Sequence, residues 1–296
     1  RPEREARVLR CVIEANQGPL RNEEMVRLFR EIMSACLALE EPLRIAFLGP
    51  AGTFTQAAAL KHFGTSIHSI PMRAISEVFR EIEAGSADYG VVPVENSTEG
   101  VVSHTLDMFL QSPLRICGEV QMRINHHLIT HATDLSAIRR IYSHRQSLAQ
   151  CREWLDAALP RIDQIEVSSN GEAVLRVRDQ VDAAAIAGQG AADIYELPIL
   201  VRNIEDKPNN TTRFLIIGTQ PIAPAGDDKT ALLVASLNRP GALFKLLEPL
   251  ARYNVSMNRI ESRPSRRGMW DYVFFIDLDG HVQDEPVAST LTELRE

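Results

Sequence analysis

The chain has 296 residues, of which 45% are hydrophobic, and a formal net charge of −7 at pH 7. This length allows about two domains with sizeable buried cores. The acidic balance argues against a nucleic-acid-binding protein, and no apolar run reaches the roughly 18 residues that a membrane span needs.

The cysteines lie far apart, without metal-ligand spacing and without a signal-peptide pattern ahead of them. They are Cys11, Cys36, Cys117 and Cys151. We interpret them as reduced thiols of a cytoplasmic protein, and we expect neither a metal nor a cofactor.

Residues 1–41 show two amphipathic helical patterns separated by the breaker sequence Asn16-Gln17-Gly18-Pro19. The sequence starts at Arg1 without a methionine and is helical at once, so we expect that an N-terminal part of the native chain is missing. Two such helices enclose no core alone, and we expect a third helix or a second chain to cover them.

From residue 44 strands alternate with helices. A strand at 44–48 leads through the glycine-rich turn 49–52 into a helix at 53–63, and strands at 67–70 and 89–94 follow. This order predicts a mainly parallel sheet with ligands at the carboxyl ends of its strands.

A second alternation follows a segment at 115–130 that is typical of one long strand. We expect a strand at 138–142, one continuous helix at 146–158, a strand at 165–167, a helix at 172–177 and a buried strand at 183–187 that leads into another helix. Strands at 199–201 and 213–217 close the pattern. Two alternations with a return predict two lobes with a cleft between them, as in binding proteins that hinge.

After Thr219 a segment rich in proline, glycine and aspartate indicates a linker. Residues 229–296 then follow the order strand, helix, strand, strand, helix, with a turn expected at 264–268. Only the last strand of a ferredoxin-like βαββαβ unit is lacking, so we expect a missing C-terminal part as well.

The segment KPNNTTRFLIIG, Lys207 to Gly218, places amide and hydroxyl side chains and one guanidinium directly before a buried strand. A loop held by a rigid element is a usual place for a small-molecule site. The same side chains can instead bond their own backbone in an ordinary loop, and both interpretations stay open at this point.

Other polar motifs also follow predicted strands. They are Gly49 to Thr55 with the Thr53 hydroxyl, the run Glu95-Asn96-Ser97-Thr98, and Tyr142 to Ser147 with Ser143 and, one turn later, Gln150. Each has a structural alternative as a turn or a helix cap. A nucleophilic triad is a poor fit, because no serine lies in a GxSxG elbow.

The histidines His126, His127 and His131 do not form a metal set. Neighbours on one strand point to opposite faces, so we interpret His126 and His127 as structural. Together, the polar motifs supply mostly neutral donors with one arginine, which suits binding a polar acid and stabilising developing charge. We therefore expect an elimination or isomerisation that the substrate itself drives.

The segments GPAGTFT, PVENSTEG, YSHRQSLAQC and NNTTRF resemble, in order and spacing, the motifs of prephenate dehydratases, and they cover about 43–219. The segments around Gly241-Ala242-Leu243 and Glu261-Ser262-Arg263-Pro264 look like those of the ACT domain, which makes these enzymes sensitive to phenylalanine. Residues 1–41 are similar to the closing helices of a chorismate mutase domain.

The resemblance implies an α/β fold class: a two-lobed, periplasmic-binding-protein-like dehydratase domain, a ferredoxin-like ACT domain and an all-α N-terminal remnant. The expected boundaries are 1–41 for the partial mutase domain, 43–219 for the dehydratase domain with its lobes split near 118 and 198, 220–228 for the linker and 229–296 for the ACT domain. It also implies that prephenate loses carbon dioxide and its ring hydroxyl to give phenylpyruvate, without a cofactor, in phenylalanine biosynthesis.

Site residues follow from the same resemblance. The expected catalytic residues are Thr212, Asn96, Gln150 and Ser143. The expected substrate-binding residues are Thr53, Glu95, Ser97, Thr211 and Arg213, with Arg213 and Thr53 as our candidates for the carboxylates. A hydroxyl is too weak an acid to protonate a substrate outright, so we assign Thr212 hydrogen-bond donation to the departing oxygen.

Regulation by L-phenylalanine is expected at the ACT-like residues Gly241, Ala242, Leu243, Glu261, Ser262, Arg263 and Pro264, in a homodimer or higher homo-oligomer. The mutase-like residues are Arg4, Glu5, Cys36 and Glu40. The long first helix of that domain is not in this sequence, so we expect mutase activity of the full-length protein rather than of this chain.

One alternative is a non-catalytic two-lobed sensor regulated by an amino acid, because the same architecture serves ligand-binding modules. A sensor has no particular need for a hydroxyl at Thr212, and that residue discriminates between the two.

Overall fold

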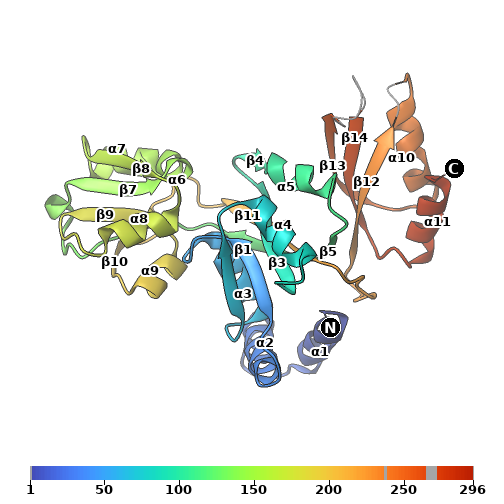
Figure 1. Ribbon diagram of the computed structural model, residues 1–296, viewed down its shortest axis with the longest axis horizontal. Helices are drawn as coiled ribbons and strands as arrows, with labels where there is room; N and C mark the ends of the chain where they lie inside the picture. Colours follow the sequence, from blue (N-terminus) through green and yellow to red (C-terminus); the bar gives the residue numbers. More distant parts are fainter. Residues whose placement is uncertain (1, 237–238, 265–271, 296) are drawn as a thin grey trace. The chain divides into compact units, whose positions relative to one another are not determined.

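The computed structural model describes residues 2–236, 239–264 and 272–295 and has the predicted α/β fold class (Figure 1). Contacts divide it into two compact units, one of Val12–Pro221 and one that combines Arg1–Cys11 with Ile222–Glu296. Both helices predicted at the N-terminus are present, as α1 (Pro2–Ala15) and α2 (Asn22–Ala38).

Lobe 1 of the larger unit is built on a sheet with the strand order β2-β1-β3-β11-β5, and β4 pairs with β3. Its elements are β1 (Arg44–Leu48), α3 (Phe54–Phe63), β2 (His68–Met72), α4 (Ile75–Glu83), β3 (Tyr89–Asn96), β4 (Gly100–Val101), α5 (Ser103–Phe109), β5 (Arg115–Arg123) and β11 (Thr211–Gly218). β1 is parallel to β2 and β3, whereas β11 lies antiparallel between β3 and β5. This return strand brings residues distant in sequence beside the end of β3.

Lobe 2 has the strand order β10-β6-β9-β7-β8. Its elements are β6 (His127–Ile129), a 3-10 turn η1 (Leu135–Ala137), β7 (Arg140–His144), α6 (Arg145–Gln150), α7 (Arg152–Ala158), β8 (Asp163–Val167), α8 (Asn170–Val177), β9 (Ala183–Ala187), α9 (Gln189–Tyr195) and β10 (Ile199–Val201).

The central strand β9 explains how lobe 2 is covered on both faces. All five of its residues are fully buried. Ala183, Ala185 and Ala187 pack with residues of α8 and α9, whereas Ala184 and Ile186 pack with residues of α6 and α7. Because successive strand residues point to opposite faces, one apolar run serves two helical layers.

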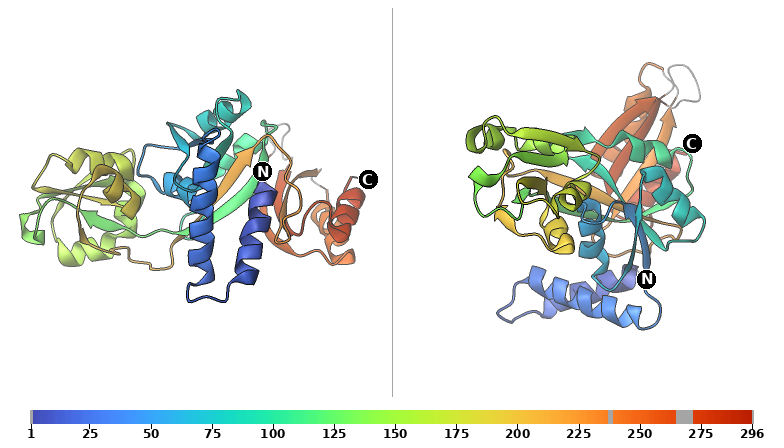
Figure 2. Two further views of the ribbon diagram at one scale, coloured as in Figure 1. Left: turned by 90° about the horizontal axis from the view of Figure 1, so that it is seen from below. Right: turned by 60° about the vertical axis from the view of Figure 1, so that its left-hand side comes forward.

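The segment predicted as one strand from 115 to 130 is divided between the lobes. β5 belongs to lobe 1 and β6 to lobe 2, and residues 124–126 cross between them. The second crossing is 202–210, so the chain changes lobe a few residues later than the expected positions 118 and 198. The two crossing segments run side by side (Figures 1 and 2) and are bonded to each other, Ile124 N–H to Asn210 O at 2.8 Å and Ile204 N–H to His126 O at 2.9 Å.

The helix predicted at 146–158 is interrupted at Cys151, where α6 ends and α7 begins. The carboxylate of Asp206, on the second crossing segment, accepts hydrogen bonds from the N–H groups of Glu153 and Trp154 at the start of α7. This capping from a distant segment gives α7 its own start directly after Gln150.

The C-terminal part of the smaller unit has the predicted strand, helix, strand, strand, helix order. It consists of β12 (Lys229–Ser236), α10 (Ala242–Arg252), β13 (Met257–Pro264), β14 (Tyr272–Asp279) and α11 (Glu285–Glu293), in a sheet with β14 in the middle. After Pro264, the turn predicted at 264–268 lies outside the described residues. No helix in the described part of the chain is long and apolar enough to cross a membrane.

Candidate active site

A chain of hydrogen bonds between side chains joins the lobes. Asn96, at the end of β3, lies opposite Thr212 of β11. Its Nδ2 donates to Thr212 Oγ1 and to Asn210 Oδ1, both at 2.8 Å. Asn210 Nδ2 in turn donates to Gln150 Oε1 of lobe 2 at 3.0 Å, and His126 Nε2 lies 2.8 Å from the same oxygen.

The direction of these hydrogen bonds is fixed at the Asn96 end. Asn96 Oδ1 accepts from the backbone N–H groups of Thr98 and Glu99, at 2.9 and 3.0 Å. Since a backbone N–H can only donate, the oxygen of Asn96 must face them and its NH2 must face Thr212 and Asn210. The Asn210 oxygen therefore accepts, and its NH2 donates to the Gln150 oxygen.

This polarity leaves two donors for a ligand. The Thr212 oxygen accepts from Asn96, so its own O–H is not needed inside the chain. Gln150 uses its oxygen inside the chain, and its NH2 has no acceptor among the described residues. The structure thus brings Thr212, Asn96 and Gln150 together, joined by Asn210, which is 3% exposed.

Ser97 and Thr211 hold the backbone at this place. Ser97 Oγ accepts from the N–H of Thr211 at 2.9 Å, and the Ser97 N–H donates to Thr211 O at 2.8 Å. These bonds lengthen the pairing of β3 with β11, which positions Asn96 and Thr212. In this structure Ser97 and Thr211 therefore bond to each other through these groups.

Arg213 and Glu95 do not lie with Thr212. Adjacent residues of a strand point to opposite faces, and Arg213 points away from the face that carries Thr212. Its Nε donates to Glu119 Oε2 at 2.6 Å, and its Nη1 is 3.9 Å from Glu95 Oε2. The expected binding of a substrate carboxylate by Arg213 stays a prediction, and in this structure its guanidinium lies beside the carboxylates of Glu119 and Glu95.

Thr53 occupies the N-cap of α3. Its hydroxyl donates to Leu48 O at 3.1 Å and accepts from the Gln56 N–H at 3.4 Å. In this structure the single hydroxyl proton of Thr53 is directed at Leu48 O, and the expected binding of a carboxylate by this side chain stays a prediction. The group at this place that can still attract a carboxylate is the positive end of the α3 helix dipole.

Ser143, fully buried at the end of β7, lies outside the hydrogen-bond chain. Its hydroxyl is 2.8 Å from Ile186 O and 3.1 Å from Asn170 Oδ1, and Asn170 also bonds Ser147. These contacts tie β7, α6 and the start of α8 together inside lobe 2. Ser143 supports the frame of that lobe in this structure and is not brought to Thr212.

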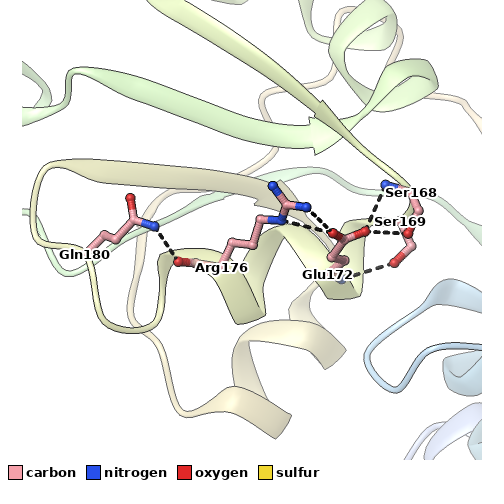
Figure 3. Close-up of polar contacts among 5 residues, drawn as sticks. All are labelled: Ser168, Ser169, Glu172, Arg176 and Gln180. Carbon is pink, nitrogen blue, oxygen red and sulfur yellow. Dashed lines mark hydrogen bonds and ion pairs between the residues drawn. The ribbon is translucent and has the colours of Figure 1, made fainter.

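The start of α8 is fixed by hydrogen bonds of Ser168, Ser169 and Glu172, drawn in Figure 3. Ser169 accepts from the Glu172 N–H at 3.1 Å, and the Glu172 carboxylate accepts from the backbone and hydroxyl of Ser168. Arg176 donates to the other carboxylate oxygen through Nε at 2.9 Å. The Ser168 hydroxyl and then Arg176 hold the pKa of Glu172 below its usual range.

The start of α8 lies against the glycine-rich turn of lobe 1. A Cβ added at Gly171 would stand 2.3 Å from Ala51 O, and one at Gly188 would stand 2.6 Å from the Phe54 ring. Tyr195 Oη donates to the same Ala51 oxygen at 3.4 Å. The two lobes therefore approach here at glycine positions that leave no room for a side chain.

His126 and Asn210 are the members of the chain that sequence reasoning missed. His126 is 1% exposed, packs edge-on against Phe54 with ring centroids 5.6 Å apart, and has its pKa lowered by burial. Asn210 was visible in the NNTTRF segment as an amide before a strand. For His126 the adjacency to His127 gave no signal, because its partners come from α6 and α3.

The ACT-like residues gather at one end of the C-terminal sheet. Ser236, the last residue of β12, and Pro264, the last of β13, both lie opposite Tyr272 of β14. Gly241 precedes α10 with a φ of 80° and no side-chain cap, and Leu243 is exposed. Residue 236, which precedes the segment 241–243, and the segment 261–264 therefore lie at the same end of the sheet.

The mutase-like residues fall in both compact units. Arg4 and Glu5 lie on the part of α1 that belongs to the smaller unit, whereas Cys36 and Glu40 are exposed residues at the end of α2 in the larger one. The described residues contain no group of three His, Cys, Asp or Glu side chains that could hold a metal ion.

Comparison with known proteins gives a consistent picture. A family model of prephenate dehydratases matches residues 45–222, one of ACT domains matches 230–296, and one of type II chorismate mutases matches 1–41. A bifunctional chorismate mutase/prephenate dehydratase of Stutzerimonas stutzeri is 59% identical over 99% of this chain and 81% of its own length.

Solved structures share the fold. A prephenate dehydratase from Arthrobacter aurescens in complex with L-Phe has a TM-score of 0.78 and 36% identity over 86% of both chains. GqqA, a protein named as a novel type of quorum quenching acylase, has a TM-score of 0.77 and 30% identity over 85% of this chain and 92% of its own. Since one fold carries differently named activities, function has to be argued from the site.

Proposed function

The chain belongs to the prephenate dehydratase family, and we propose that it converts prephenate to phenylpyruvate in the cytoplasm. In this reaction the bond from the ring to its carboxyl group breaks and leaves its electron pair in the ring. The ring carbon–oxygen bond breaks with its pair on the departing oxygen, which becomes water once protonated. The products are phenylpyruvate, carbon dioxide and water.

The observation that carries the proposal is the fixed polarity of the chain from Asn96 to Gln150. Because Asn96 donates to the Thr212 oxygen, the Thr212 O–H is free to donate to the departing oxygen as negative charge develops there. Gln150 offers its NH2 to a second substrate oxygen. Aromatisation supplies the driving force, so a preorganised set of neutral donors that orients the substrate is sufficient.

The carboxylates of prephenate need a positive electrostatic potential, which helix N-termini can supply without an arginine. We assign them to the N-termini of α3 and α8, which start beside each other where Gly171 meets Ala51. Arg213 is not included, since it is paired with Glu119 on the other face of the sheet.

The test is turnover of prephenate, followed as phenylpyruvate. The unaltered chain should form phenylpyruvate, and Thr212→Val should lower kcat by about 10²- to 10³-fold, the effect of removing one donor to a developing oxyanion. Thr212→Ser, which keeps the hydroxyl, is the control and should retain most of the rate. Equal rates for Thr212→Val and the unaltered chain would remove Thr212 from the mechanism.

A sensor without activity would give a different result. It would bind prephenate without forming phenylpyruvate, and its affinity would be the same with serine or valine at position 212. Measuring binding by calorimetry beside the turnover assay separates the two functions.

We further propose that L-phenylalanine inhibits the enzyme by binding near Gly241 and the segment 261–264. Support comes from the match to ACT domains and from the position of Ser236 and Pro264 at the same end of the sheet. Inhibition by added L-phenylalanine should be lost, and activity kept, in a chain that ends at Thr219. Persisting inhibition would place the site elsewhere.

An assembly of two or more copies is part of this proposal. β12 and β13 are edge strands of the described sheet and carry Leu233 and Ile260, which are 44% and 37% exposed. Light scattering should give a mass of at least twice 33.0 kDa.

Residues 1–41 match a chorismate mutase model, and we propose that they form part of such a domain. Consumption of chorismate tests whether this chain retains that activity.

A further inference from the structure

His126 ends the hydrogen-bond chain on the lobe 2 side, and the proposed reaction assigns it no task. It lies on the first crossing segment, directly before β6. Its backbone N–H donates to Glu205 Oε2 at 2.8 Å, and its ring is held between Phe54 and Gln150. Both its backbone and its ring are therefore fixed, and the ring is 1% exposed.

The polarity of the chain determines which ring nitrogen carries the proton. Gln150 must present its oxygen to Asn210, because the Asn210 NH2 faces it. The same Gln150 oxygen lies 2.8 Å from His126 Nε2, and an oxygen can only accept, so Nε2 must be the protonated nitrogen. His126 Nδ1 is then bare, and this buried atom has no partner among the described residues.

We propose that His126 is a positioning residue of the dehydratase reaction: its Nε2–H holds the Gln150 amide in the one orientation that leaves the Gln150 NH2 and the Thr212 hydroxyl free to donate to the substrate. The inference rests on the proposed function. Without the His126 donor, the Gln150 oxygen keeps only the hydrogen bond from Asn210, and the Gln150 amide can rotate more easily out of this orientation. In the rotated state the NH2 groups of Gln150 and Asn210 face each other. The Gln150 NH2 and the Thr212 hydroxyl then lose their fixed direction toward the substrate.

The alternative is that His126 only fills space beside Phe54. The two readings differ in what a substitution of equal bulk does. A space-filling role is served by any apolar side chain of similar size, whereas a positioning role needs an N–H at the place of Nε2. Glutamine supplies such a group, because its side-chain nitrogen reaches as far as His Nε2.

The kinetic test compares His126→Leu with His126→Gln in the full chain, using the phenylpyruvate assay. We expect His126→Leu to lower kcat by about tenfold to a hundredfold, as substitutions that disturb the orientation of a site ligand do. His126→Gln should stay within about threefold of the unaltered chain, because one hydrogen bond to the Gln150 oxygen is kept. Equal losses for both variants would show that the N–H is not what matters and would overturn the role.

His127 provides a matched control. It is the neighbouring histidine, but its Nδ1 accepts from the Asn203 N–H and takes no part in the chain. His127→Leu should leave kcat within about threefold. A loss as large as that of His126→Leu would attribute the effect to general damage at the crossing segment, against the proposal.

Combining the His126 substitution with one at Gln150 tests whether His126 acts through Gln150. If His126 acts only by orienting Gln150, then His126→Leu should change kcat by less than about twofold in a Gln150→Leu chain, since the partner is already gone. A full additional loss there would overturn the proposed path.

Nitrogen-15 NMR of ring-labelled protein tests the geometry without turnover. We expect a protonated Nε2 and an unprotonated Nδ1 for His126 at neutral pH. The opposite tautomer would leave His126 without a proton to donate to the Gln150 oxygen and would overturn the positioning role even in an active enzyme. A chain that shows the expected tautomer but forms no phenylpyruvate would instead overturn the proposed function, and the catalytic part of this inference with it.

Discussion

The two faces of β11 carry adjacent residues with opposite environments. On one face Thr212 belongs to a chain of neutral side chains, with Asn96 and Asn210. On the other face Arg213 lies between the carboxylates of Glu119 and Glu95. The neutral chain uses its oxygens internally and leaves N–H and O–H donors for a ligand, whereas the ionic cluster balances its own charges. The alternation of side chains along β11 thus places Thr212, the donor that we propose for catalysis, and Arg213, a member of an ionic cluster, on opposite faces.

The largest effect is expected from charging the neutral face. Asn96→Asp replaces the NH2 with an oxygen, so the Thr212 hydroxyl has to donate to residue 96 and is lost to the substrate. We expect kcat to fall by about 10²- to 10³-fold. Glu119→Gln on the other face is the control and should keep kcat within about threefold. A fully active Asn96→Asp enzyme would contradict the proposal that the face with Thr212 serves catalysis.

Removing the cation from the ionic face should affect stability more than activity. Arg213 and Glu119 side chains are only 17% and 20% exposed, and Arg213→Met leaves the two carboxylates facing each other. We expect a loss of about 2–3 kcal/mol in the free energy of unfolding, near the lower end for breaking a buried pair. Urea denaturation measures it, and the double variant Arg213→Met with Glu119→Leu should recover part of the loss. A raised KM without a loss of stability would assign Arg213 to the substrate instead.

The pH dependence of stability sharpens the comparison, because His126 is the titratable member of the neutral chain. Burial lowers the pKa of His126, although Gln150 and Glu205 oppose this and His127 adds to it. An unfolded histidine takes up a proton below about pH 6.5, while the folded one stays neutral, so the free energy of unfolding falls as pH drops below that value. His126→Gln should lose less stability between pH 7 and 5 than the unaltered chain. Identical pH profiles would indicate a His126 that is not buried in solution.

The smallest effect concerns the charged Glu172 at the start of α8. The Glu172 pKa is lowered in the folded state, so its contribution is present above the ordinary carboxyl value of about 4.3 and is lost as pH falls through the folded value. At pH 7 we expect Glu172→Gln to cost less than about 1 kcal/mol, since Arg176 is half exposed. Thermal unfolding should show this difference shrinking toward pH 3. A difference that grows in acid would contradict the assignment.

The order of strands and helices follows from the sequence because apolar runs alternate with glycine and proline turns. The crossing at 124–126 does not, since the apolar alternation continues through Ile124 and no glycine or proline marks the change of lobe. The break at Cys151 is equally hidden, because the cap comes from Asp206, 55 residues later.

The candidate site was partly predictable for a related reason. Thr212, Asn96 and Gln150 stand in motifs that end strands or begin helices, so their type and place were visible. Arg213 was grouped with Thr212 by adjacency, although the alternation that separates His126 from His127 also separates these two. His126 depends on contacts with Phe54 and Gln150, which only the packing of the lobes brings together.

The two crossing segments are bonded to each other at Ile124 and Ile204 and form one ribbon rather than two separate connections. His126 and Asn210 are part of that ribbon, so a rotation of lobe 2 against lobe 1 displaces the atoms that aim the Thr212 hydroxyl. We therefore expect an opening of the lobes to displace the donor that we propose for catalysis as well. On this basis we expect the open molecule to be inactive and the closed one to be competent for turnover.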